Sequence, residues 1–177
     1  MARLFSGSGA LRLVPILLLL VGSLIGPPRI AVADDLPAAR GPILLTVSGQ
    51  IGASDGPMQF DRAGLESLGL RHLKTHTYWT DGVQDFEGVL FRDLLRAVDA
   101  QGTVALMVAL NDYSVEIPLS DATSYDVLIA VKQNGSDMPI RDKGPLWLIY
   151  PIDDHPELDR KLTADKMIWQ LSRIIVK

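Results

Sequence analysis

Apolar and polar residues alternate with a period of two in several short segments of this chain. Residues 45–51 and 113–118 follow that pattern, which is typical of strands with one buried face. Residues 71–78 and 83–89 are rich in strand-forming side chains and flank the dipeptide Asp81-Gly82, a favourable hairpin turn. The remaining segments that predict strands are 104–110, 125–131 (closed by an Asn134-Gly135 turn), 146–150 and 168–176.

Helical periodicity is found in two places. Asp61 can cap a short helix over 62–68, and Gly69 can end it. Leu90, Leu94 and Val98 form an apolar stripe on a second helix that we expect to end near Gly102. About eight short strands with two or three helices predict one α+β domain with a mainly antiparallel, mixed sheet.

The first 33 residues have the pattern of a secretory signal. Arg3 and Arg12 precede an apolar stretch over 13–25, which is too short to span a bilayer, and residues 31–33 (Ala-Val-Ala) match a cleavage site. We expect cleavage after Ala33, a short leader over 34–42, a domain over 43–177 and a periplasmic or secreted protein. The mature chain would then have no transmembrane segment. The alternative is a retained amphipathic or membrane anchor.

Removal of this segment changes the charge. The full chain of 177 residues has a formal charge of −4, and the expected mature chain loses three arginines and no acid, which brings it to −7. An acidic domain is poorly suited to bind the phosphate backbone of nucleic acids, so we expect no nucleic-acid partner. No twin-arginine pair precedes the apolar stretch. We therefore expect the chain to cross the membrane unfolded and to meet any cofactor outside.

The 177 residues include no cysteine. Disulfides, thiolate zinc sites, iron–sulfur clusters and cysteine nucleophiles are therefore excluded. No Gly-x-Ser-x-Gly elbow, phosphate-binding glycine loop or dinucleotide fingerprint occurs in residues 34–177. The sequence thus identifies no catalytic residue.

Two segments contain side chains that bind metals in other proteins. His72 and His76 lie in an expected strand, where a separation of four residues is about 13 Å and too large for one metal. Asp153, Asp154, Glu157 and Asp159 gather around His155 and could hold calcium, or they could form an ordinary solvated loop.

Three polar or aromatic segments are candidates for a small-molecule pocket. They are 75–81, 111–113 and the basic loop 141–145. Aromatic faces beside fixed hydrogen-bonding groups are a common pocket lining. Equally, Trp79, Trp147 and Trp169 could each only fill the core.

These segments carry a family resemblance. Residues 77–82 leading to 86–95, then 109–118, 141–151 and 168–171, resemble in order and spacing the small exported members of the oxidoreductase molybdopterin-binding domain family. The likeness covers about 43–177 and implies the fold of the sulfite-oxidase catalytic domain. It also implies a molybdopterin cofactor, although no cofactor is assured by the sequence itself.

The resemblance assigns roles to particular residues. Arg141 and Lys143 would hold the cofactor phosphate, and Asn111, Asp112 and Tyr113 would lie at the pterin. The remaining cofactor-binding candidates are Trp79, Thr80 and Asp81. In catalytic members a cysteine thiolate binds molybdenum in this last region, and this chain has no thiol there. In addition, Trp147 stands where the family has an arginine.

Three hypotheses follow. The first is a non-catalytic exported module that binds a small ligand or pterin in the vacated pocket, or contacts a membrane-bound sensor or redox partner. The second is a molybdopterin-dependent periplasmic oxidoreductase that binds its cofactor without a cysteine ligand. The third is an extracellular module stabilised by calcium at residues 153–159.

Overall fold

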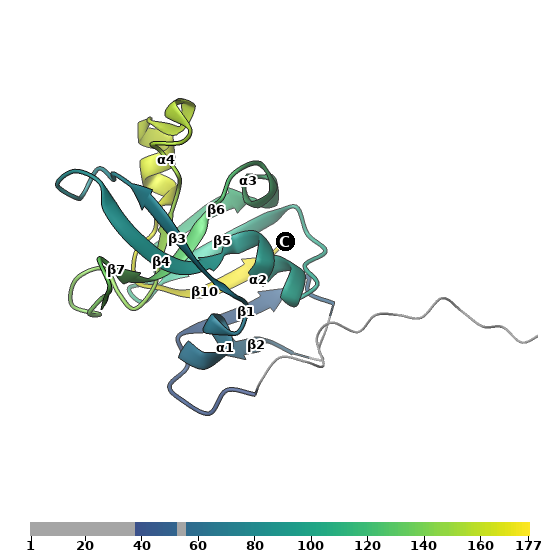
Figure 1. Ribbon diagram of the computed structural model, residues 1–177. Coiled ribbons are helices and arrows are strands. Elements are labelled where there is room, and N and C mark those ends of the chain that lie inside the picture. Colours follow the sequence, from purple (N-terminus) through teal and green to yellow (C-terminus); the bar gives the residue numbers. More distant parts are fainter. Residues whose placement is uncertain (1–37, 53–55) are drawn as a thin grey trace, which may run out of the picture. The chain divides into compact units, whose positions relative to one another are not determined.

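The computed structural model describes residues 38–52 and 56–177, and their strands form two five-stranded sheets (Figure 1). The expected signal segment and its cleavage site lie outside these residues. The first sheet has the strand order β2 (Met58–Phe60), β1 (Leu45–Gly49), β10 (Leu171–Val176), β5 (Val104–Ala109) and β6 (Ser114–Pro118). Its strands β1 and β10 are parallel, and the other neighbours are antiparallel.

The second sheet is antiparallel throughout. It has the order β3 (Leu70–Thr75), β4 (Gln84–Leu90), β7 (Leu128–Gln133) and β8 (Ser136–Asp137), and β9 (Trp147–Ile149) also pairs with β7. The predicted α+β class with a mainly antiparallel, mixed sheet is therefore confirmed.

Two predicted helices are present with shorter bounds. Helix α1 (Arg62–Glu66) has the expected cap, because an Asp61 oxygen accepts from the Gly64 amide at 2.8 Å. Helix α2 (Phe91–Ala97) ends before the predicted Gly102. The chain reverses there because Asp99 has a φ of 48°, which takes the backbone out of the helix.

The sequence pattern missed several short elements. They are β2, β8, α3 (Leu119–Ser124), the 3-10 helix η2 (Pro156–Leu158) and α4 (Lys161–Lys166). Each has two to six residues, too few to show a period. Within the described parts of the chain, no helix has the length and apolar character needed to cross a bilayer.

Several predicted strands begin late or end early because a turn takes their terminal residues. The predicted 125–131 strand begins at Leu128, since Tyr125 ends α3. The predicted 168–176 strand begins at Leu171, since Gln170 has a φ of 53° and breaks the extended run. Residues 168–169 are thereby separated from the strand and become part of a pocket wall.

The core lies along the two sheets and includes the tryptophan found at the expected arginine position. Trp147 is fully buried, as are Phe86 on β4 and Leu148 beside it. The ring of Trp147 meets that of Phe86 edge to face at 5.4 Å between centroids. The core-filling interpretation is therefore confirmed for Trp147.

Asp61 also joins α1 to the start of the described chain. Its second carboxylate oxygen accepts from the amides of Arg40 and Gly41, both at 2.8 Å. These bonds, with the one from Gly64, hold the pKa of Asp61 below its usual value. The end of the predicted leader is thus bonded to the domain.

Candidate functional site

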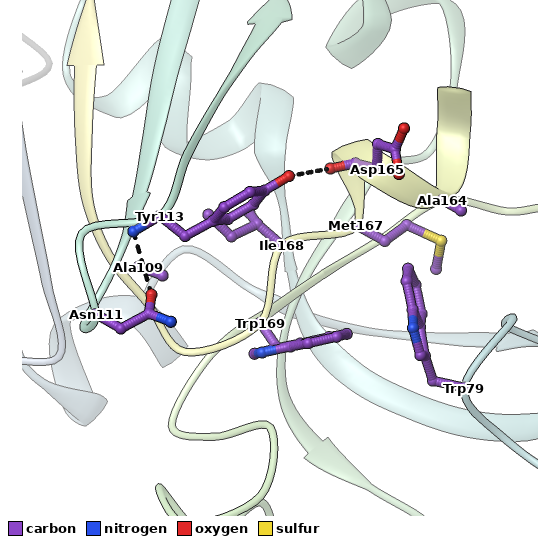
Figure 2. A pocket seen from close by; sticks show the side chains of 9 residues that line it. All are labelled: Trp79, Ala109, Asn111, Tyr113, Ala164, Asp165, Met167, Ile168 and Trp169. Atoms are coloured by element: carbon purple, nitrogen blue, oxygen red, sulfur yellow. Dashed lines mark hydrogen bonds between the residues drawn. The ribbon is translucent and has the colours of Figure 1, made fainter. Parts of the chain in front are cut away.

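A pocket of about 330 Å³ lies between three segments that are far apart in the sequence (Figure 2). They are the turn after β3, the corner between β5 and β6, and the chain from the end of α4 to β10. The lining residues are Trp79, Ala109, Asn111, Tyr113, Ala164, Asp165, Met167, Ile168 and Trp169.

Trp79 is held in a tight turn by threonine side chains. The Thr77 amide donates to the Thr80 hydroxyl oxygen at 3.1 Å, and the Trp79 amide donates to the Thr77 hydroxyl oxygen at 3.2 Å. The side chain of Trp79 stays 37% exposed. A large apolar ring is thus fixed at the surface, where a ligand can reach it.

His76, just before this turn, and Tyr78, within it, are bonded to acidic residues that follow β9 in the chain. The His76 amide donates to one oxygen of Asp153 at 2.8 Å, and its ring Nδ1 lies 2.7 Å from the other. Burial opposes ionisation of Asp153, but the hydrogen bonds from His76 outweigh it and lower its pKa. The Tyr78 hydroxyl donates to Asp159, which raises the pKa of that tyrosine.

The two segments that could bind a metal, the pair His72 and His76 and the acidic residues at 153–159, are held by these and similar contacts. Asp153 and Asp159 are bonded to the turn, and Glu157 lies 3.2 Å from the ring of His155. Among the described residues, no three acidic or histidine side chains are placed to share a metal ion. The ring of His72, on β3, lies 3.0 Å from Asp85, whereas the ring of His76 contacts Asp153.

Trp79 belongs to a cluster of three indoles. Its ring meets that of Trp169 at 90°, with 5.0 Å between centroids. The Trp147 ring lies behind both, with its centroid 6.2 Å from that of Trp79 and 6.5 Å from that of Trp169. The Trp147 indole nitrogen donates to the Met167 carbonyl at 2.9 Å. The buried indole thereby positions the segment that carries Met167 and Trp169.

The corner between β5 and β6 forms the opposite wall. The Asn111 side-chain oxygen accepts from the Tyr113 amide at 3.2 Å, and the Tyr113 hydroxyl donates to the Asp165 carbonyl at 3.5 Å. Figure 2 shows the Asn111 amide nitrogen directed into the cavity. Asp112, at a φ of 63°, turns away and pairs with Arg173 at 2.6 Å beside a neighbouring groove.

The structure brings together three of the eight predicted cofactor-binding residues. Trp79, Asn111 and Tyr113 line the pocket. The Thr80 side chain bonds within its own turn, and the Asp81 carbonyl accepts from Gln84 at 2.7 Å.

The basic loop lies beside the pocket rather than in it. The Lys143 ammonium is 5.5 Å from the centroid of the Trp147 ring and 3.1 Å from Asp142. Arg141 is exposed and is not among the residues that line the cavity.

The sequence did not predict that residues 164–169 form a wall of the pocket. The sequence predicts a strand that includes Ile168 and Trp169, because they continue the apolar pattern of 171–176. The available signal was weak: the polar Lys166 before and Gln170 after them bound a short apolar group.

The chain matches a known family over about half of its length. The family model described as "Oxidoreductase molybdopterin binding domain" matches residues 65–152. The chain contains a domain of this family. No curated protein matches the chain. The match includes Trp79, Asn111 and Tyr113 but ends before α4, so residues 164–169 come from outside it.

The family implies a molybdopterin cofactor, and the residues present do not fit its metal or its charge. The chain has no cysteine, and the Thr80 hydroxyl, 3.0 Å from that of Thr77, is no substitute for a soft thiolate. Of the described residues that line the pocket, only Asp165 is charged, and it is an acid. An anionic pterin dithiolene phosphate would therefore meet no basic partner within this lining.

Proposed function

We propose that this molybdopterin-binding-type domain is a non-catalytic module that binds a small organic molecule in the pocket lined by Trp79 and Trp169. One observation carries the proposal: two accessible indoles meet at right angles on a pocket of about 330 Å³ that also holds Asn111 and Tyr113. An aromatic cavity with a few polar groups is the usual form of a small-ligand site.

The chemistry of the lining supports binding rather than catalysis. Its polar side chains are an amide, a phenol and one exposed carboxylate, from Asn111, Tyr113 and Asp165. The Tyr113 hydroxyl bonds to a main-chain carbonyl, so its proton is not directed to a general base. These groups can orient a ligand but form no nucleophile and base pair.

The family match favours a second candidate, a molybdopterin-dependent oxidoreductase that binds its cofactor without a cysteine ligand. In that case Arg141 and Lys143 would have to move toward the pocket to meet a phosphate. The position of Lys143 over the Trp147 ring argues against it. A membrane-bound sensor or redox partner remains compatible with either candidate.

We also propose that the protein acts in the periplasm or outside the cell. The support is the apolar stretch over 13–25 followed by Ala-Val-Ala at 31–33. Intact-mass analysis of the protein recovered from a periplasmic extract should give a chain that begins at Asp34. A chain that keeps residues 1–33 and stays with the membrane fraction would support the anchor instead.

Metal and pterin analysis tests the proposed function. The protein is isolated from its native compartment after growth with molybdate, and molybdenum is measured by mass spectrometry and pterin by fluorescence. We expect neither in stoichiometric amount. In parallel, the wild-type protein and the Trp169→Leu variant are screened by thermal shift against small cations, anions and neutral compounds. Some of these compounds should raise the melting temperature of the wild-type protein and leave that of the variant unchanged. Stoichiometric molybdenum together with redox turnover would refute the proposal.

A further inference from the structure

The indoles of Trp79 and Trp169 form two perpendicular walls of the pocket. Their planes meet at 90°, and Figure 2 shows one end of the Trp169 ring directed at Trp79. This arrangement leaves a corner that is bounded by the π-faces of both rings, with Met167 above it (Figure 2). Indole faces carry negative electrostatic potential and attract cations.

Tyr113 and Asp165 at the pocket also favour a cation. Tyr113 donates its proton to the Asp165 carbonyl, which leaves the lone pairs of the phenol oxygen as acceptors. The Asp165 carboxylate is exposed at the rim, where it can attract a cation from solvent.

The nearest lysine in the sequence does not neutralise this potential. Lys166 follows Asp165, but its ammonium is held 2.6 Å from Asp121 and 5.8 Å from the Tyr150 ring centroid. Lys143 lies over Trp147, in the layer behind the two accessible indoles.

We propose that the pocket binds a small methylated ammonium compound, with its cationic head against the faces of Trp79 and Trp169. This inference rests on the proposed function and names the ligand class of the same site. A methylated ammonium matches the corner because it is both apolar at its surface and positively charged, and indole is the best aromatic partner for such a cation.

The opposite end of the cavity favours a polar tail on that ligand. Figure 2 shows the Asn111 amide nitrogen and the Trp169 indole nitrogen directed toward the same part of the cavity. Both are hydrogen-bond donors, so a hydroxyl or carboxylate oxygen a few atoms from the ammonium can accept from them. Choline and glycine betaine have this form.

Calorimetric titration of the full chain with choline and with 3,3-dimethylbutan-1-ol tests the inference. The alcohol has the shape of choline and lacks its charge. We expect choline to bind about tenfold more tightly, which corresponds to a cation–π contribution of about 1.4 kcal/mol.

Substitutions locate the binding. Trp79→Leu and Trp169→Leu should each weaken choline binding about tenfold, and Trp79→Phe and Trp169→Phe should retain most of it because a ring face remains. Asp165→Asn should weaken it about threefold at low salt and less at high salt. Leu162→Ala is the matched control, since Leu162 lies on the same helix as Ala164, is 72% exposed and is outside the lining.

The outcomes separate the two proposals. Tighter binding of choline that depends on both tryptophans supports the ligand class. Equal binding of the neutral alcohol, or preference for an anion at the same tryptophans, overturns the ligand class and leaves the small-molecule function standing. If no cation, anion or neutral compound binds to the wild-type protein, both proposals fail.

Discussion

The Trp147 indole nitrogen donates to the main-chain carbonyl of Met167 across 2.9 Å, in the fully buried layer behind the pocket. This bond joins β9 of the second sheet to the segment that leads into β10 of the first. The position at which the family resemblance leads us to expect an arginine therefore holds a side chain that shapes the pocket wall.

Trp147→Phe tests this role. The variant keeps an aromatic ring but leaves the Met167 carbonyl without its partner, so we expect a loss of about 2 kcal/mol in the free energy of unfolding. Urea unfolding followed by circular dichroism measures it. The same substitution at Trp169, whose indole faces the pocket, should cost clearly less. Equal costs at the two positions would show that the bond to Met167 contributes nothing.

A second, partly buried contact holds α4 in place. One oxygen of Asp121, in the first turn of α3, accepts from the Tyr150 hydroxyl at 2.8 Å and from the Lys166 ammonium at 2.6 Å. Burial, together with Asp121, raises the pKa of Tyr150 strongly, so this phenol stays protonated.

Asp121→Ala should lower the free energy of unfolding by about 2 kcal/mol, because a buried hydroxyl loses its acceptor. Asp121→Asn keeps an acceptor oxygen and should lose about half as much. Thermal or urea unfolding of the two variants checks the order. If alanine and asparagine were equally stable there, the Tyr150 bond would carry no weight.

The pH dependence of stability should reflect Asp61. Its pKa is lowered in the folded protein by bonds from Gly64, Arg40 and Gly41, so the ionised form stabilises the fold above the unfolded pKa of about 3.9. That stabilisation is lost as the pH falls through the lower, folded pKa.

The wild-type protein should therefore melt at a higher temperature than Asp61→Asn at pH 7, and the gap should close as the pH falls below about 4. Scanning calorimetry between pH 7 and pH 2.5 measures both proteins. A gap that persists unchanged at the acid end would mean that the charge of Asp61 is not its source.

At Gly88 the backbone of β4 passes close to that of β7. A Cβ atom at this position would overlap the Ile129 carbonyl oxygen and the Ala130 backbone. Gly88→Ala should therefore cost about 3 kcal/mol of stability. Gly56→Ala is the control, since nothing lies within 4 Å of its Cβ position. Comparable stability of both variants in urea would contradict the close approach.

Local signals predicted much of the fold. The Asn134-Gly135 turn has positive φ at both residues, 49° and 76°, as an Asn-Gly hairpin requires. The Asp61 cap and the 71–78 and 83–89 hairpin are also present, although each strand is shorter at one end. These features depend on neighbouring residues alone.

The pocket could be predicted only in part because it is a non-local feature. The polar-aromatic neighbourhoods of Trp79, Asn111 and Tyr113 predict that these residues line a pocket. Trp169 meets Trp79 only through the pairing order of distant strands. The local pattern gives only a weak sign that Gln170 breaks the strand and frees Trp169 to line the cavity. The family resemblance and the charge of the basic loop predict Arg141 and Lys143 at the site, but neither shows where the loop points.

Native mass spectrometry of the protein isolated from its own compartment tests the central claim most directly. The account predicts a small organic molecule bound to the wild-type protein and lost from Trp169→Leu, with no molybdenum isotope pattern in either. A bound mass equal to a molybdenum-loaded pterin, retained by Trp169→Leu, would contradict it.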